Sequence, residues 1–120
     1  MKRPSPKPVV WLADTRTVLR TCPQEVRDEV GYALYLAQIG EKYFRAKPLK
    51  GLGPGVLEIV SDRRGDTYRG IYTVQFADVV YVLHVFQKKS KKGVRTPQSE
   101  IELVRQRLKR AAELQKQREN

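Results

Sequence analysis

The sequence predicts one α+β domain with an antiparallel sheet, in the element order β-α-α-β-β-β-α. Three observations lead to this prediction. The chain has 120 residues, the length of one ordinary domain. Its second half has three stretches rich in β-branched and aromatic residues, and the short links between them favour antiparallel pairing. Its first half carries apolar residues at helical spacing, namely Val26, Val30, Ala33, Leu34 and Ala37.

The N-terminal segment is expected to begin with an arm and a short strand. Residues 1–8 are rich in proline, lysine and arginine, which is typical of a flexible basic arm. Residues 9–12 form a short apolar run and are predicted as a strand. Asp14 follows and is placed to cap a short helix that reaches about Arg20.

A longer helix is predicted for residues 23–40. Pro23 suits the first turn of a helix, because its missing N–H would have no partner there. Gly40 is placed to end this helix. The following residues 41–55 mix cations, Lys50 among them, with prolines and glycines, which indicates a basic loop.

Three strands are predicted in succession, at residues 56–60, 67–76 and 79–86. Residues 62–66 are turn material, and Ala77-Asp78 makes a tight link between the last two strands. Residues 79–86 carry apolar side chains on both faces, so this strand is expected to be central and buried. We expect helices mainly on one face of the sheet, with the other face bare and its rim cationic.

The last helix is predicted to begin at Thr96-Pro97, with Thr96 as the cap and Pro97 in the first turn. Residues 115–120 have little to bury and are expected to form a frayed tail. The single domain is therefore predicted to span residues 9–114. The apolar stripe of this helix consists of Ile101, Val104, Leu108 and Ala111.

The composition limits the classes of partner. Lysine and arginine number 24 and aspartate and glutamate 13, so the formal net charge is 24 − 13 = +11, which favours a polyanion. Cys22 is the single cysteine, which fits a reducing compartment, and with His84 as the single histidine we expect no metal site. There is no signal-peptide pattern and no apolar run of roughly 20 residues. We therefore expect a cytoplasmic protein with no membrane contact and no cofactor.

The most informative residues lie on two neighbouring strands. Residues equidistant from a hairpin turn lie opposite each other, so Arg69 is expected to meet the Phe86–Lys88 end of the next strand. Such a group of cations suits phosphates, and Phe86 offers a face for base stacking. The residues expected at the reaction centre are Arg69, Lys88, Lys89 and His84. Those expected to bind RNA are Lys50, Arg63, Arg64, Phe86, Lys91 and Lys92.

Cleavage of a bound RNA would not need a metal, because RNA carries its own nucleophile, the 2′-hydroxyl. The sequence shows no cluster of carboxylates like that of a two-metal nuclease. His84 or a lysine crowded by other cations would transfer protons. Structural interpretations stay open: His84 and Phe86 as core residues, residues 88–92 as a solvated turn, and Glu58 as a partner that orients a cation.

The same stretches resemble the phage-related, HigB-like branch of the RelE/ParE toxin superfamily. The likeness covers about residues 9–112. Tyr68-Arg69 on one strand and the His-x-Phe-x-Lys-Lys pattern that begins at His84 are together fairly specific. The other matching stretches are Lys47-Pro-Leu-Lys-Gly51, Val56-Leu-Glu-Ile59, residues 66–73, residues 80–90 and Thr96-Pro97.

This resemblance implies the toxin of a type II toxin–antitoxin pair. Such toxins cleave mRNA in the ribosomal A site and are silenced by a small helix-turn-helix antitoxin. Carried over residue by residue, Arg69, Lys88 and Lys89 would contact phosphate, and Phe86 would stack on a base. Two alternatives stay open: a non-enzymatic poison of DNA gyrase, as in other branches of the superfamily, and a phage-derived RNA-binding protein.

Overall fold

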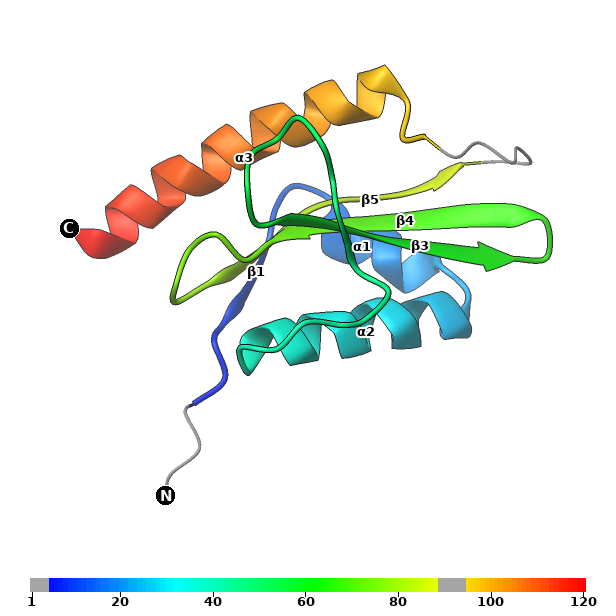
Figure 1. The fold of residues 1–120 in the computed structure, drawn as a ribbon, viewed down its shortest axis with the longest axis horizontal. Helices are drawn as coiled ribbons and strands as arrows, with labels where there is room; N and C mark the ends of the chain where they lie inside the picture. The colour runs from blue at the N-terminus through cyan, green and yellow to red at the C-terminus, as the bar shows by residue number, and fades with distance from the viewer. Residues whose placement is uncertain (1–4, 89–94) are drawn as a thin grey trace.

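The computed structural model describes residues 5–88 and 95–120 (Figure 1). The predicted α+β class is confirmed, and so is the order of the main elements. One two-residue strand, β2, is added inside the segment that was expected to be a basic loop. The elements are β1 Val9–Trp11, α1 Thr15–Thr21, α2 Gln24–Gln38, β2 Lys47–Pro48, β3 Val56–Arg63, β4 Asp66–Thr73, β5 Val80–Lys88 and α3 Gln98–Glu119.

The five strands form one mixed sheet in the order β1-β5-β4-β3-β2. Strands β2 to β5 pair antiparallel, as expected, whereas β1 pairs parallel with β5. A parallel pair needs a long connection, and the whole chain between β1 and β5 supplies one. Strand β5 lies between β1 and β4 and its residues Val80–Val85 are buried, in agreement with its apolar sequence.

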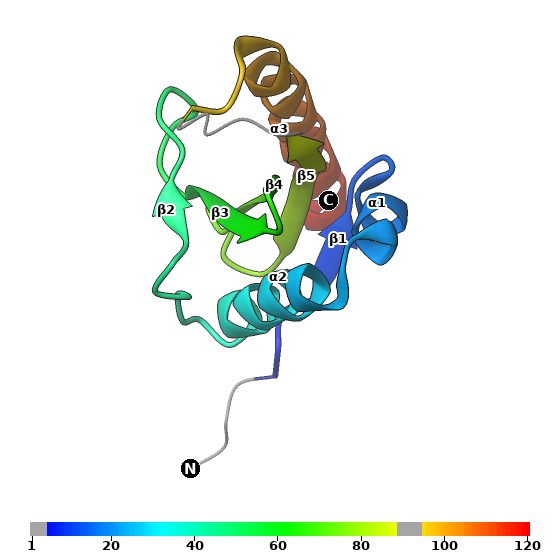
Figure 2. The same cartoon turned by 90° about the vertical axis from the view of Figure 1, so that its right-hand side faces the viewer.

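Helices cover both faces of the sheet, which corrects the expectation that they lie mainly on one face. Helices α1 and α2 pack on one face through residues such as Val26 and Val30. Helix α3 packs on the other face through Val104 and Ala111 (Figures 1 and 2). The physical reason is that the second face is also apolar, with Leu83 among its fully buried residues, so it needs a cover.

The hairpin turns fix which residues face each other. The β3–β4 turn consists of Arg64 and Gly65, whose φ angles of 52° and 86° suit a tight two-residue turn. The β4–β5 link spans residues 74–79, longer than the expected Ala77-Asp78 link, because Phe76 leaves the strand and packs edge-on against Tyr81.

Helix α3 differs from its prediction at both ends. Its N-cap residue is Pro97, and the hydroxyl of Thr96 is bonded to Glu58 instead of capping the helix. At the other end the helix continues to Glu119, past residue 114, where we expected a frayed tail to begin. The reason is that Gln115 is buried and is bonded to Tyr81 and Asp78. No helix in the described part of the chain is both long and apolar enough to cross a membrane.

Candidate functional site

The candidate site lies on the α3 side of the sheet, near the N-terminal end of α3. In the β4–β5 ladder Arg69 pairs with Phe86, and Thr67 pairs with Lys88, which confirms the expected register. In the β3–β4 ladder Arg69 pairs with Val60. Because side chains alternate between the faces of a strand, every second residue of three strands converges on this surface.

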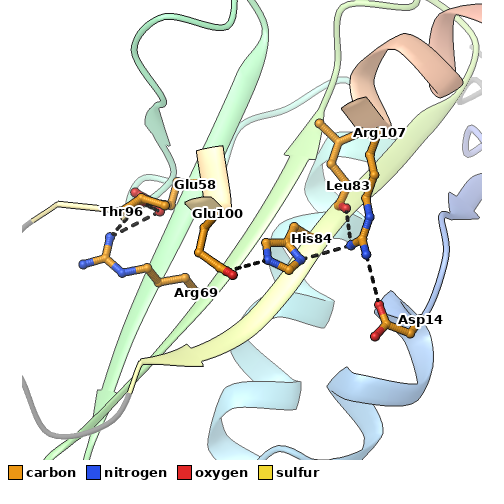
Figure 3. Close-up of polar contacts among 8 residues, drawn as sticks. All are labelled: Asp14, Glu58, Arg69, Leu83, His84, Thr96, Glu100 and Arg107. Carbon is orange, nitrogen blue, oxygen red and sulfur yellow. Dashed lines mark hydrogen bonds and ion pairs between the residues drawn. The ribbon is translucent and has the colours of Figure 1, made fainter. Parts of the chain in front are cut away.

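Arg69 is deeply buried and paired with a carboxylate. Its side chain is 2% exposed, and its NH1 lies 3.2 Å from Oε2 of Glu58, which is 12% exposed. The same nitrogen donates to the hydroxyl oxygen of Thr96 at 3.3 Å, and that hydroxyl donates to Glu58 (Figure 3). The cluster joins β3, β4 and the residue before the N-cap of α3. The sequence predicted the position of Arg69, and the contact agrees with the alternative in which Glu58 orients a cation, whereas the part played by Thr96 was not predicted.

His84 is held on both sides of its ring. Nδ1 lies 3.0 Å from NH1 of Arg107, and Nε2 lies 3.0 Å from Oε2 of Glu100 (Figure 3). An arginine can only donate, so Nδ1 accepts and Nε2 carries the proton that is donated to Glu100. Arg107 also donates to the carbonyl of Leu83 at 3.0 Å and to Asp14 at 3.5 Å. The geometry therefore gives His84 the role of a buried structural residue.

Phe86 stacks on this fixed histidine. The two ring centroids are 4.8 Å apart and the planes meet at 21°. Phe86 is half-buried and packs against the second core, the one beneath α3. Its position beside Arg69 follows from the β4–β5 register, and the ring on which it stacks is fixed by the network that holds His84.

The lysines divide into those that the structure places and those that it does not. Lys88 is half-buried and donates to the carbonyl of Arg95 at 3.2 Å. Lys50 is exposed and lines a hollow of about 410 Å³ with Glu58, Arg95 and Thr96. Three further predicted residues, Lys89, Lys91 and Lys92, lie outside the described residues.

Two predicted arginines are not brought to the site. Arg63 lies 3.7 Å from Glu29 of α2, so it is on the opposite face of the sheet from Arg69. Strand β3 extends to residue 63, and the alternation of side chains then directs Arg63 toward α2. Arg64 forms the exposed tip of the β3–β4 hairpin.

Glu58, whose side chain is 12% exposed, borders two hollows. It lines the hollow beside Lys50 and also a second hollow of about 470 Å³, which lies beside Phe44 and Lys47. The described residues hold no group of three or more histidines, cysteines or acids that could bind a metal ion. The two hollows are lined by the carboxylates of Glu58 and Asp62 and by Lys47 and Lys50, and Arg69 is paired with Glu58.

Sequence reasoning missed three side chains of this network. Glu100 and Arg107 are seven residues apart, two turns of a helix, and so lie on the same face of α3. This spacing could have predicted that both side chains contact the same residue, which is His84. The contact of Thr96 with Glu58 spans 38 residues of sequence and has no local signal.

The chain is similar to a family of phage-derived proteins and to one solved toxin structure. Residues 17–109 match the family model described as "Phage derived protein Gp49-like". A solved structure of the E. coli toxin RelE, a double arginine-to-alanine mutant in the free state, has a similar fold with a TM-score of 0.55. The two sequences are 20% identical, over 88% of this chain and 97% of that chain. No curated protein matches the sequence.

Proposed function

Because the chain belongs to the Gp49-like family of phage-derived proteins and shares the RelE fold, we propose that it is the toxin of a type II toxin–antitoxin system that cleaves mRNA on the ribosome. Its cognate partner would be a small helix-turn-helix antitoxin. The observation that supports the activity most is the pairing of Arg69 with Phe86 beside the Glu58 carboxylate. A buried cation, a half-buried aromatic ring and a proton acceptor therefore lie close together on the α3 side of the sheet.

The reaction we propose uses the 2′-hydroxyl of the RNA. Its oxygen forms a bond to the adjacent phosphorus, and the bond to the 5′-oxygen of the next nucleotide breaks. The products are a 2′,3′-cyclic phosphate and a free 5′-hydroxyl. One proton leaves the 2′-oxygen and another reaches the departing 5′-oxygen, and the phosphorane between them carries extra negative charge that cations must neutralise.

Glu58 and Arg69 suit these steps as a pair. Glu58 accepts the proton of the 2′-hydroxyl, since it lines both hollows and lies beside the guanidinium. When Glu58 takes up the proton, its negative charge beside Arg69 disappears, so the field of the guanidinium acts more strongly on the phosphorane as it forms. Lys88 or Lys50 supplies the proton for the leaving oxygen. His84 acts as a positioning residue, because both of its nitrogens are engaged and its ring supports Phe86.

The test is a translation extract in which cleavage is mapped by primer extension. We expect codon-phased cuts with the wild-type protein, on translating mRNA only. Arg69→Lys should abolish the cuts or slow them at least 100-fold, since one well-placed charge-stabilising donor is worth about 100- to 1,000-fold in rate. Glu58→Gln should have a similar effect, because a positioned general base is worth about 100- to 10,000-fold. Arg110→Ala, which removes an exposed arginine from α3, is the matched control and should cut normally. Circular dichroism checks that every variant is folded.

The outcomes separate the alternatives. Intact message together with trapped gyrase–DNA complexes would assign the protein to the gyrase poisons. An RNA that the protein retards in a native gel but does not cut would indicate an RNA-binding protein. Full cleavage by Arg69→Lys and Glu58→Gln would mean that the reaction occurs elsewhere on the surface.

A further inference from the structure

Phe44 is an exposed aromatic side chain that the proposed reaction does not use. It lies between α2 and β2 and is 82% exposed, more than Tyr32 at 54% or Tyr35 at 49%. Its ring packs edge-on against Tyr43, with centroids 5.2 Å apart. Tyr43 is itself fixed by a 2.8 Å hydrogen bond to Glu29. The ring of Phe44 therefore has an ordered support and a large surface in contact with solvent.

The hollow beside Phe44 has the chemistry of a nucleotide site. Its volume of about 470 Å³ falls in the range of small-molecule sites, about 300–1,000 Å³. Lys47 lines it, is exposed, and makes no ion pair with the described residues. Arg45 also lines it and is anchored to Glu29 at 3.2 Å. These two cations suit a phosphate.

The same hollow is also lined by an oriented carboxylate. Asp62 is exposed, and its Oδ1 accepts a 2.6 Å hydrogen bond from the hydroxyl of Thr67. This bond sets the direction of the carboxylate and leaves Oδ2 without a hydrogen bond from any residue that the structure describes. A carboxylate oxygen accepts from the amino group of a base, which adenine, cytosine and guanine have and uracil lacks.

We propose that this hollow binds one base of the RNA, next to the cleaved phosphate. The base stacks on Phe44, the carboxylate of Asp62 accepts a hydrogen bond from its amino group, and Lys47 contacts its phosphate. The inference rests on the proposed function and adds to it a preference for amino-bearing bases over uracil at one position. Glu58 lines both hollows, so the bound base lies directly beside the reacting centre.

A nucleotide fits these residues better than a protein partner does. A protein helix needs a continuous apolar groove, whereas this hollow combines one aromatic ring with charges of both signs. Single strands are bound by aromatic side chains together with a cationic track, and the chain has a net charge of +11.

The experiment measures cleavage of mRNA on programmed ribosomes that differ in the codon offered. Phe44→Ala should raise KM about tenfold or more, as expected for loss of one base stack. Phe44→Tyr should restore KM to within about twofold, whereas Phe44→Leu should not, because it lacks the π-face. Asp62→Asn should reduce the preference for amino-bearing bases over uracil. Tyr35→Ala removes another exposed aromatic side chain, from α2, and is the matched control.

Failure of this inference can be distinguished from failure of the proposed function. If the wild type cleaves and Phe44→Ala has the same KM on every codon, the subsite is overturned and the nuclease stands. If the wild type cleaves nothing, the Kd for short fluorescent RNA oligomers is measured instead. Phe44→Ala should then raise this Kd about tenfold, and an unchanged Kd would overturn the subsite. A Phe44→Ala toxin that cleaves normally but escapes its antitoxin would overturn the proposal and assign the surface to that protein.

Discussion

Arg107 donates a 3.0 Å hydrogen bond from its guanidinium to Nδ1 of His84. Because arginine keeps its charge, a proton on Nδ1 would place two donors and two positive charges face to face. The contact therefore requires a neutral imidazole with its proton on Nε2, where Glu100 accepts it. The single histidine of the chain therefore links β5 with α3, and both of its ring nitrogens are engaged.

Replacing Arg107 by methionine should destabilise the fold without changing any residue that lines the two hollows. The variant loses bonds to Leu83, His84 and Asp14, and leaves a half-satisfied histidine in the core. We expect a loss of about 2–4 kcal/mol in the free energy of unfolding, measured by urea denaturation. Arg110→Met is the control on the same helix and should change stability by less than about 0.5 kcal/mol. Equal stabilities of the two variants would mean that the bonds of Arg107 contribute nothing to the free energy of unfolding.

Replacing Glu58 by glutamine should destabilise the protein and make its stability sensitive to phosphate. The change removes the carboxylate that lies 3.2 Å from the 2% exposed guanidinium of Arg69, at a cost of about 3 kcal/mol. An anion that binds Arg69 would restore part of this loss by mass action. Thermal unfolding with added inorganic phosphate should therefore raise the Tm of Glu58→Gln more than that of the wild type. The double variant with Arg69→Met should not respond, and a response equal to that of Glu58→Gln would place the anion elsewhere.

The parts of the site that follow from local periodicity could be predicted from the sequence. Two strands joined by a short link fix a register, so the meeting of Arg69 with Phe86 could be predicted without a structure. The same alternation would have excluded Arg63 if β3 had been predicted to reach residue 63 instead of stopping at residue 60.

The remaining parts depend on contacts between distant segments. That α3 covers the second face depends on how Val104 packs against the sheet, and no pattern within the helix distinguishes one face from the other. The bond between Thr96 and Glu58 forms only after β3 and the N-terminal end of α3 have been brought together. A threonine placed before a proline therefore resembled a helix cap in the sequence, while its hydroxyl has a different partner in the fold.

Tyr72 should make the protein less stable in alkali. Burial raises the pKa of its phenol to about 12, from the ordinary value of 10, and its hydroxyl has no hydrogen-bond partner among the described residues. The unfolded chain ionises first, so the free energy of unfolding falls as the pH rises from about 10 to about 12, by up to roughly 2–3 kcal/mol. Tyr72→Phe should remove this component and be as stable as the wild type, or more stable, at neutral pH. An unchanged slope in urea titrations at these pH values would contradict the assignment.

Lys50 should contribute one phosphate contact to RNA binding. It is exposed at the rim of the hollow that contains Glu58 and makes no ion pair with the described residues, so its charge is available to a polyanion. Each phosphate neutralised on a single strand changes the slope of log K against log salt by about −0.7. Lys50→Ala should make that slope shallower by about 0.7, measured by fluorescence anisotropy of a labelled RNA, and by the same amount for different RNA sequences. Lys109→Ala, an exposed lysine on α3, is the control and should keep the wild-type slope. If both variants lose the same amount, RNA binding follows the overall charge, and the hollow beside Lys50 is not where the phosphates lie.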